Sequence, residues 1–225
     1  MDIDVLRQAP LFSGLDDEAA AALSASMTAC RLRRGDVLFH EGDAGDRLYV
    51  VTDGKVKLGR TSSDGRENLL AILGPGQMFG ELSLFDPGPR SASVTAVTDC
   101  TMQSLSHDEL LKLLDGRPQV ARALLWQLAS RLRKTNDVVA DLVFSDVPGR
   151  VAKALLDLAG RFGREADDGV HVHHDLTQEE LAQLVGASRE TVNKALADFA
   201  SRGWLRLEPR SVVLLDVDRL RHRAR

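Results

Sequence analysis

The distribution of glycine and proline divides the chain into regions with different backbone requirements. Ten of the eighteen glycines lie between Gly35 and Gly88, whereas residues 119–147 contain neither glycine nor proline. Glycine permits the tight turns that connect short strands, and proline interrupts the interior of a helix. The sequence therefore predicts a domain of strands and turns, followed by one long helix that ends before Pro148.

Short segments typical of β-strands lie between the glycines of the first region. Asp53-Gly54 and Asp64-Gly65 are turn dipeptides that commonly join neighbouring strands. Strands at a spacing of about ten residues predict an antiparallel roll or sandwich. The predicted strands are 36–40, 47–51, 55–61, 67–73, 91–98 and 101–105. Residues 1–30 are expected to form short helices beside the roll, because residues 16–25 are rich in Ala and also hold the helix formers Glu18 and Leu23.

The long segment after Pro118 carries two rows of mostly apolar residues at seven-residue spacing. This spacing predicts the seam of a coiled coil. One interpretation is a core helix packed on the roll, and the other is a helix that pairs with a second copy of the chain. Charged flanking residues such as Arg122 and Arg131 favour the dimer. The rows are Ala121, Leu128, Thr135 and Leu142, and Leu125, Leu132 and Val139.

Residues after the break at Pro148-Gly149 predict a helix-turn-helix. A helix over 150–162 and a loop over 165–169 come first. Thr177 to Glu180 then match a capping box, and Ser188 is suited to cap a second helix after Gly186. Two short helices joined by a glycine turn are typical of this motif. Residues 205–207 and 212–215, on either side of Pro209, predict a β-hairpin wing.

Positive charge is concentrated near the end of an otherwise acidic chain. The net charge is −4, yet residues 189–225 hold nine basic and five acidic residues. Arg189, Glu190, Asn193 and Lys194 lie on the polar face of the second predicted helix. Arg and Lys bind guanine O6 and N7, and Glu accepts from cytosine N4. These residues are suited to an ordinary solvated surface too, but with the helix-turn-helix and the wing they favour binding to double-stranded DNA.

A second polar cluster lies in the strand-and-turn region. Glycine allows backbone N–H groups to approach a phosphate, and an arginine pairs with phosphate oxygens. A carboxylate repels a bare phosphate, so its presence indicates a second acceptor role, for which a ribose hydroxyl is the natural donor. The alternative is a structural ion pair between Glu81 and Arg90. The cluster comprises Gly80, Glu81, Leu82, Ser83, Arg90 and Ser91.

Several other classes of function are not expected. The sequence has no apolar run long enough to span a membrane and no secretion signal, which predicts a cytoplasmic protein. Cys30 and Cys100 are too few for a disulfide framework. His171, His173 and His174 could suggest a metal site, but their alternation favours a strand at 170–174. No nucleophile–base pair supports an enzyme.

Three motifs together resemble the cAMP receptor protein (CRP/FNR) family of transcription regulators. FGELSLFDPGPRSA at 79–92 is similar to the family's phosphate-binding cassette, and TNDVVADLVFSDVPGR at 135–150 to its dimer helix and hinge. LTQEELAQLVGASRETVNKAL at 176–196 resembles its helix-turn-helix. The resemblance covers nearly the whole chain and implies an α+β fold. Its expected parts are a jelly-roll-like, cyclic-nucleotide-binding β-roll at 1–116, a dimerisation helix and hinge at 117–145, and a winged helix-turn-helix domain at 146–225.

The resemblance also implies roles for individual residues. Thr135 and Asn136 would meet the purine of cAMP, which would explain a polar residue in the apolar seam. The residues implied to hold cAMP are Gly80, Glu81, Leu82, Arg90, Ser91, Thr135 and Asn136. Those implied to contact DNA are Gln178, Ser188, Arg189, Glu190, Asn193 and Lys194. Asn136, Lys194 and Gln178 differ from the serine and the two arginines of the best-known member.

The expected function is that of a cAMP-responsive homodimer without catalytic activity. The resemblance implies binding to inverted repeats with half-sites similar to TGTGA, and RNA polymerase as a further partner. The alternative is a cyclic-nucleotide-binding regulatory protein that acts on a protein partner. The predicted recognition helix argues against this alternative, because such a regulatory protein needs no base-reading helix.

Overall fold

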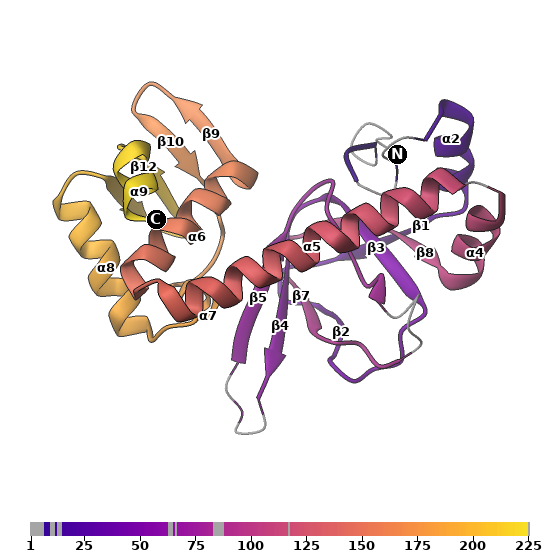
Figure 1. Cartoon of the computed structure of the whole chain (residues 1–225), viewed down its shortest axis with the longest axis horizontal. Coiled ribbons are helices and arrows are strands. Elements are labelled where there is room, and N and C mark those ends of the chain that lie inside the picture. The colour runs from indigo at the N-terminus through magenta and orange to yellow at the C-terminus, as the bar shows by residue number, and fades with distance from the viewer. Residues whose placement is uncertain are drawn as a thin grey trace. The chain divides into compact units, whose positions relative to one another are not determined.

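The computed structural model describes residues 7–9, 12, 15–62, 65, 67–82, 88–116 and 118–224 (Figure 1). The chain forms two compact units, residues 1–60 with 71–134 and residues 61–70 with 135–225. Asp64 of the predicted Asp64-Gly65 turn and Ser83 of the polar cluster lie outside the described residues. No described helix is long and apolar enough to cross a membrane.

The strands between Thr28 and Ser106 form an antiparallel β-roll, most of which belongs to the first unit. Its described strands form two sheets, with the orders β1-β8-β3-β6 and β2-β7-β4-β5. The first sheet contains β1 (Thr28–Leu32), β8 (Cys100–Ser106), β3 (Arg47–Asp53) and β6 (Met78–Phe79). The second contains β2 (Val37–Phe39), β7 (Ser93–Ala96), β4 (Val56–Thr61) and β5 (Glu67–Leu73). The roll predicted from the glycine-separated segments is therefore confirmed.

Strand β3 shows how the alternation of side chains builds two cores. Successive residues of a strand point to opposite faces of the sheet. Leu48 and Val50 belong to a core that includes residues of α2 (Asp17–Ala25), α4 (His107–Gly116) and α5 (Pro118–Phe144). Tyr49 and Val51 pack in the core between strands of the two sheets, together with Phe79. The sheet is therefore apolar on both faces, and helices cover the outer one (Figure 1).

Three elements of this unit were not predicted. Residues 28–30 were expected to be helical, but they begin strand β1, which pairs with β8 from Thr28↔Ser104 to Leu32↔Cys100. The two-residue strand β6 pairs with β3, and helix α4 follows β8 directly. The first two depend on pairing with strands distant in sequence, which local composition does not reveal.

Helix α5 runs without interruption from Pro118 to Phe144, as the absence of glycine and proline predicts. Its first turns belong to the core of the roll, because Val120 and Leu124 are buried there. Four seam residues remain more than half exposed in the single chain: Leu125, Leu132, Val139 and Leu142. The core interpretation therefore holds for the start of the helix, and an exposed apolar row follows it.

The second unit contains the predicted helix-turn-helix. Helices α6 (Val147–Phe162), α7 (Gln178–Val185), α8 (Arg189–Ser201) and α9 (Val217–Arg223) pack with a sheet whose described strands have the order β11-β12-β10-β9. These strands are β9 (Gly163–Ala166), β10 (Gly169–Val172), β11 (Leu205–Glu208) and β12 (Ser211–Leu214). The loop predicted over 165–169 is wrong at both ends, since Glu165 and Ala166 belong to β9 and Gly169 begins β10.

Local capping sets the ends of these helices. Asp146 caps α6 through the Gly149 N–H, and Thr177 with Glu180 forms the predicted capping box of α7. Gly186 ends α7 in the left-handed region (φ 70°), which favours glycine. Ser188 then caps α8 by accepting from the Thr191 N–H at 3.2 Å. The predicted starts of α7 and α8 and the predicted glycine turn are therefore confirmed. The start predicted for α6 at residue 150 is wrong, because α6 begins at Val147 and its first turn accommodates Pro148 and Gly149.

Candidate functional site

Gly80 lies where a side chain would block the approach of an arginine. Its φ is +81°, and a Cβ atom there would lie 2.8 Å from the Arg47 carbonyl oxygen and 2.9 Å from Nη1 of Arg90. A substitution would therefore be strained by the backbone conformation and by the contacts. The glycine allows the Arg90 guanidinium to lie against the backbone at the end of β6.

The Arg90 side chain is buried, and one of its terminal nitrogens is hydrogen-bonded to the backbone. Its Nη1 donates to the carbonyl oxygens of Arg47 at 2.9 Å and Gly80 at 3.1 Å. Its guanidinium carbon lies 4.2 Å from the ring centroid of Phe39, a distance suited to a cation–π contact. Burial lowers the pKa of Arg90, although an arginine remains charged at physiological pH. Among the described residues, its buried Nε has no hydrogen-bond partner.

Glu81, which follows Gly80 in the sequence, supplies a buried carboxylate. Only 1% of the residue is exposed. Its Oε1 accepts from Nη1 of Arg131 on α5 at 2.6 Å. Its Oε2 is buried and has no hydrogen-bond partner among the described residues. The structural pair expected as an alternative, Glu81 with Arg90, is thus replaced by a pair with Arg131.

The other predicted ligand residues are more exposed. Leu82 and Ser91 are exposed at the two ends of the segment that contains residues 83–87. Thr135 and Asn136 are exposed on α5, one helical turn after Arg131, and belong to the second unit. The structure therefore brings together Gly80, Glu81 and Arg90, with Arg131 added. The roles of Thr135 and Asn136 remain predictions.

The predicted base-reading helix α8 presents its first turn to solvent. Arg189, Glu190 and Lys194 are exposed, and Lys194 Nζ pairs with Glu190 Oε1 at 2.8 Å. Gln178, at the start of α7, is exposed too. Asn193 differs, because it is half-buried and its Oδ1 lacks a partner within the described part of the chain. The charged side chains of Arg189, Glu190 and Lys194 are therefore accessible from solvent, whereas Asn193 is partly covered by the rest of the protein.

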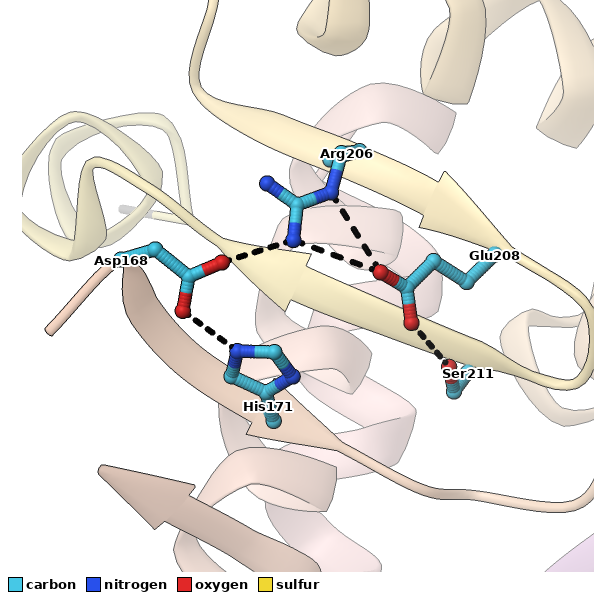
Figure 2. A network of polar contacts seen from close by, with 5 residues as sticks. All are labelled: Asp168, His171, Arg206, Glu208 and Ser211. Carbon is cyan, nitrogen blue, oxygen red and sulfur yellow. Dashed lines mark hydrogen bonds and ion pairs between the residues drawn. The ribbon is translucent and has the colours of Figure 1, made fainter. Parts of the chain in front are cut away.

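A network of charged side chains crosses the wing (Figure 2). Arg206 on β11 donates to Asp168 at 2.8 Å and to Glu208 at 3.3 Å. His171 Nε2 lies 2.6 Å from the other Asp168 oxygen, and Ser211 donates to Glu208. The guanidinium of Arg206, followed by the imidazole of His171, lowers the pKa of Asp168 to about 2. The charge of Arg206 is therefore engaged by two carboxylates of its own chain.

Comparison with known families matches both units. The family described as "Cyclic nucleotide-binding domain" matches residues 29–117, which include Gly80, Glu81 and Arg90. The family described as "Crp-like helix-turn-helix domain" matches residues 149–223, which include the whole of α7 and α8. The chain belongs to the CRP/FNR family of transcription regulators.

Relatives of this regulator are similar along most of its length. It is 55% identical over 222 residues to the CRP-like cAMP-activated global transcriptional regulator of Mycobacterium tuberculosis, covering 99% of both chains. It is 39% identical to the cyclic AMP receptor protein of Thermus thermophilus, covering 92% of this chain and 93% of that one. A solved structure of the c-di-GMP responsive regulator CLP of Xanthomonas campestris matches with a TM-score of 0.76 at 28% identity, covering 88% and 99% of the two chains.

The histidines and cysteines of the regulator show no metal-binding arrangement in the described residues. His171 contacts Asp168, and His174 is buried with its Nδ1 accepting from the Leu176 N–H at 3.1 Å. Cys30 and Cys100 are free thiols, and burial raises the pKa of Cys100 to about 11. Cys100 is therefore a protonated core residue at neutral pH.

Sequence reasoning missed two arginines that organise the regulator. Arg131 is predicted only as a charged flank of the seam, although its place one helical turn before Thr135, a residue implied to meet the purine, is a sequence signal that it lies near the site. Arg150 on α6 donates to three backbone carbonyls, those of Ser145, Val185 and Gly186. Backbone acceptors leave no signal in the sequence, so the role of Arg150 required the structure.

Proposed function

We propose that this regulator binds cAMP at Gly80, Glu81 and Arg90, and that cAMP controls its binding to DNA. One observation carries the proposal: the buried Glu81 Oε2 and the buried Arg90 Nε both lack partners among the described residues. Buried polar groups are nearly always hydrogen-bonded in folded proteins, so such atoms call for an explanation. A ligand that offers both a hydroxyl donor and an anionic acceptor would satisfy them.

The chemistry of a cyclic nucleotide matches this donor set. Arg90 would pair with the cyclic phosphate, and the Gly80 backbone together with Ser91 would approach it closely. Glu81 would accept from the ribose hydroxyl. On α5, Thr135 and Asn136 would contact the purine, and Leu82 would cover the ligand at the entrance. Arg131 would keep the Glu81 carboxylate oriented through its existing bond.

The identity of the nucleotide needs a direct comparison. Two of the relatives are named for cAMP, whereas the Xanthomonas relative is named for c-di-GMP. Thr135 and Asn136 offer both donors and acceptors, so they do not by themselves choose between purines. The full-length relative at 55% identity supports cAMP as the ligand of this chain.

Isothermal titration calorimetry tests the site. cAMP, cGMP and c-di-GMP are titrated into the wild type and into Arg90→Ala and Glu81→Ala. Loss of one charge-assisted partner of the ligand should weaken cAMP binding by about 2–5 kcal/mol. Arg60→Ala, which removes an exposed ion pair with Glu41 on the same roll, is the matched control. Near wild-type affinity in both site variants would remove the assignment, and tighter cGMP or c-di-GMP binding would reassign the ligand.

We further propose a homodimer that binds an inverted repeat. The exposed row on α5 supplies an apolar seam, and two α8 helices would enter successive major grooves about 34–36 Å apart. The residues proposed to read base edges are Arg189, Glu190 and Lys194, with Asn193 beside them. Gln178 and Ser188 would lie near the sugar-phosphate backbone of the DNA. The division into residues 1–116, 117–145 and 146–225 follows these roles. RNA polymerase would be a partner in the cytoplasm, and no catalytic step is assigned.

A further inference from the structure

The connection between α5 and α6 is only Ser145 and Asp146, and side chains hold both residues. The carbonyl of Ser145 accepts from Arg150 Nη1 at 2.8 Å. The carboxylate of Asp146 accepts from the Gly149 N–H at 2.9 Å through Oδ1 and from Arg223 Nη2 at 2.5 Å through Oδ2. This junction is therefore fastened by two guanidinium groups from different elements.

Arg150 links the junction to the turn of the helix-turn-helix. The same guanidinium that holds Ser145 also donates to the carbonyls of Val185 at 3.1 Å and Gly186 at 3.3 Å. A Cβ atom on Gly186 would lie 3.2 Å from Cδ2 of Leu142, so the last turn of α5 already touches this turn. The cap of α8, Ser188, follows two residues after Gly186. A displacement at the junction thus has a short, bonded route to the base-reading helix.

Arg223 brings the C-terminal helix α9 to the other side of the junction. Leu220 is fully buried and anchors α9, which packs against α6. A Cβ atom on Gly149 would lie 3.3 Å from both Nη1 and the carbonyl oxygen of Arg223, so the end of α9 lies closely against the start of α6. The Arg223 bond, followed by the Gly149 N–H, lowers the pKa of Asp146, so the carboxylate is ionised at neutral pH.

The ion pair between Asp146 and Arg223 is exposed, so its effect on the geometry of the junction can be distinguished from an effect on folding stability. The Asp146 side chain is 61% exposed and that of Arg223 33% exposed. Exposed ion pairs contribute little to the free energy of folding. A charge pair in such a place can nevertheless fix the direction in which the chain leaves α5, because Asp146 is bonded on both oxygens.

We infer that Arg223 is a positioning residue for ligand-controlled DNA binding, which it serves through Asp146 by holding the α5–α6 junction in one geometry. The inference rests on the proposed function and assigns α9 a part in it. A junction held on both sides passes a shift of α5 to the Gly186 turn. A junction released from α9 absorbs part of that shift by local rotation.

The experiment measures the affinity of the full-length protein for an inverted repeat of TGTGA half-sites, with and without saturating cAMP. The ratio of the two dissociation constants reports the coupling, which in allosteric proteins is about 5–150-fold. Arg223→Gln removes the ion pair. Asp146→Asn removes the charge but keeps a side chain that caps α6. Arg221→Gln is the matched control, because Arg221 lies on the same helix and pairs with Asp218 of that helix.

Arg223→Gln and Asp146→Asn should each lower the coupling ratio by about three- to tenfold, and the double variant should lower it no further, because the two residues act as a unit. Arg223→Lys should restore part of the ratio, and Arg221→Gln should leave it unchanged. If the ratio stays at the wild-type value in both variants while only the melting temperature falls, the role is merely structural and the inference is wrong. No effect of cAMP on the wild type would contradict the proposed function itself, and the inference with it.

Discussion

Arg131 Nη1 donates to Glu81 Oε1 at 2.6 Å, which joins the long helix α5 to the buried carboxylate of the proposed nucleotide site. The Glu81 side chain is 2% exposed and that of Arg131 39% exposed. The helix that carries the exposed seam is therefore bonded to a residue proposed to bind ribose. Ligand binding and the position of α5 share one carboxylate, and this is the physical basis of the proposed coupling.

Removing Arg131 should destabilise the first unit. Arg131→Gln leaves the Glu81 carboxylate buried without its cation, so we expect the free energy of unfolding to fall by about 1–3 kcal/mol. The loss is smaller than for a fully buried ion pair, because Arg131 is partly exposed. Urea unfolding followed by circular dichroism measures the change. Arg122→Gln, on an exposed position of the same helix, should change it by less than about 0.5 kcal/mol.

Adding Glu81→Gln to Arg131→Gln should recover most of the lost stability, because the double variant buries no charge. An equal loss in the double variant would show that packing of Arg131, and not its charge, accounts for the effect.

The exposed row on α5 should mediate dimerisation. Leu132→Asp places like charges face to face across a two-fold seam, which opposes association. Sedimentation velocity should then show monomers where the wild type shows dimers. Leu111→Asp, which changes an exposed leucine of α4 outside the row, should leave the dimer intact. A persistent dimer in Leu132→Asp would return α5 to the interpretation of a core helix.

Truncation of Arg189 should change sequence preference and not only affinity. A bidentate contact to guanine contributes about 1–3 kcal/mol of discrimination, so Arg189→Ala should relax the preference at one base pair of each half-site. Competition binding with a set of single-base operator variants measures this. Arg202→Gln removes the same charge at the far end of α8, where its ion pair is with Asp198, and should alter no base preference.

The wing network predicts an unusual titration of Asp168. Carbon-detected NMR should give a midpoint of about 2 for this carboxyl. Arg206→Gln should raise the midpoint toward the ordinary aspartate value of about 3.9. Since the pKa is lower in the folded state, the stabilisation is present above pH ~4 and lost as the pH falls to about 2. Arg164→Gln on the exposed strand β9 is the control, and an equal rise in that variant would contradict the assignment to Arg206.

Local signals predicted those parts of the fold that depend on local chemistry. Thr177 with Glu180, Gly186 and Ser188 set helix ends through bonds within a few residues, so the helix-turn-helix was predictable. Strand β1 was not, because its pairing partner β8 lies some seventy residues away, as in the pair Ala29↔Gln103.

The candidate site likewise combines residues that are close in sequence with contacts between residues that are distant in sequence. Gly80, Glu81 and Arg90 are close in sequence, and their residue types indicated a phosphate and a hydroxyl donor before the fold was known. The Arg131 bond to Glu81 spans fifty residues, and the Arg150 and Arg223 bonds depend on how α6, α7 and α9 pack. Such contacts follow from tertiary structure, so sequence patterns alone did not predict them.

The most direct test of the central claim is operator binding by the full-length protein as a function of cAMP and of half-site spacing. Fluorescence anisotropy with inverted repeats of several spacings measures it. We predict that cAMP tightens binding to the repeat with centres about one helical turn apart by about 5–150-fold, and much less for other spacings or for unrelated DNA. Equal affinity for every spacing, with and without cAMP, would contradict the account.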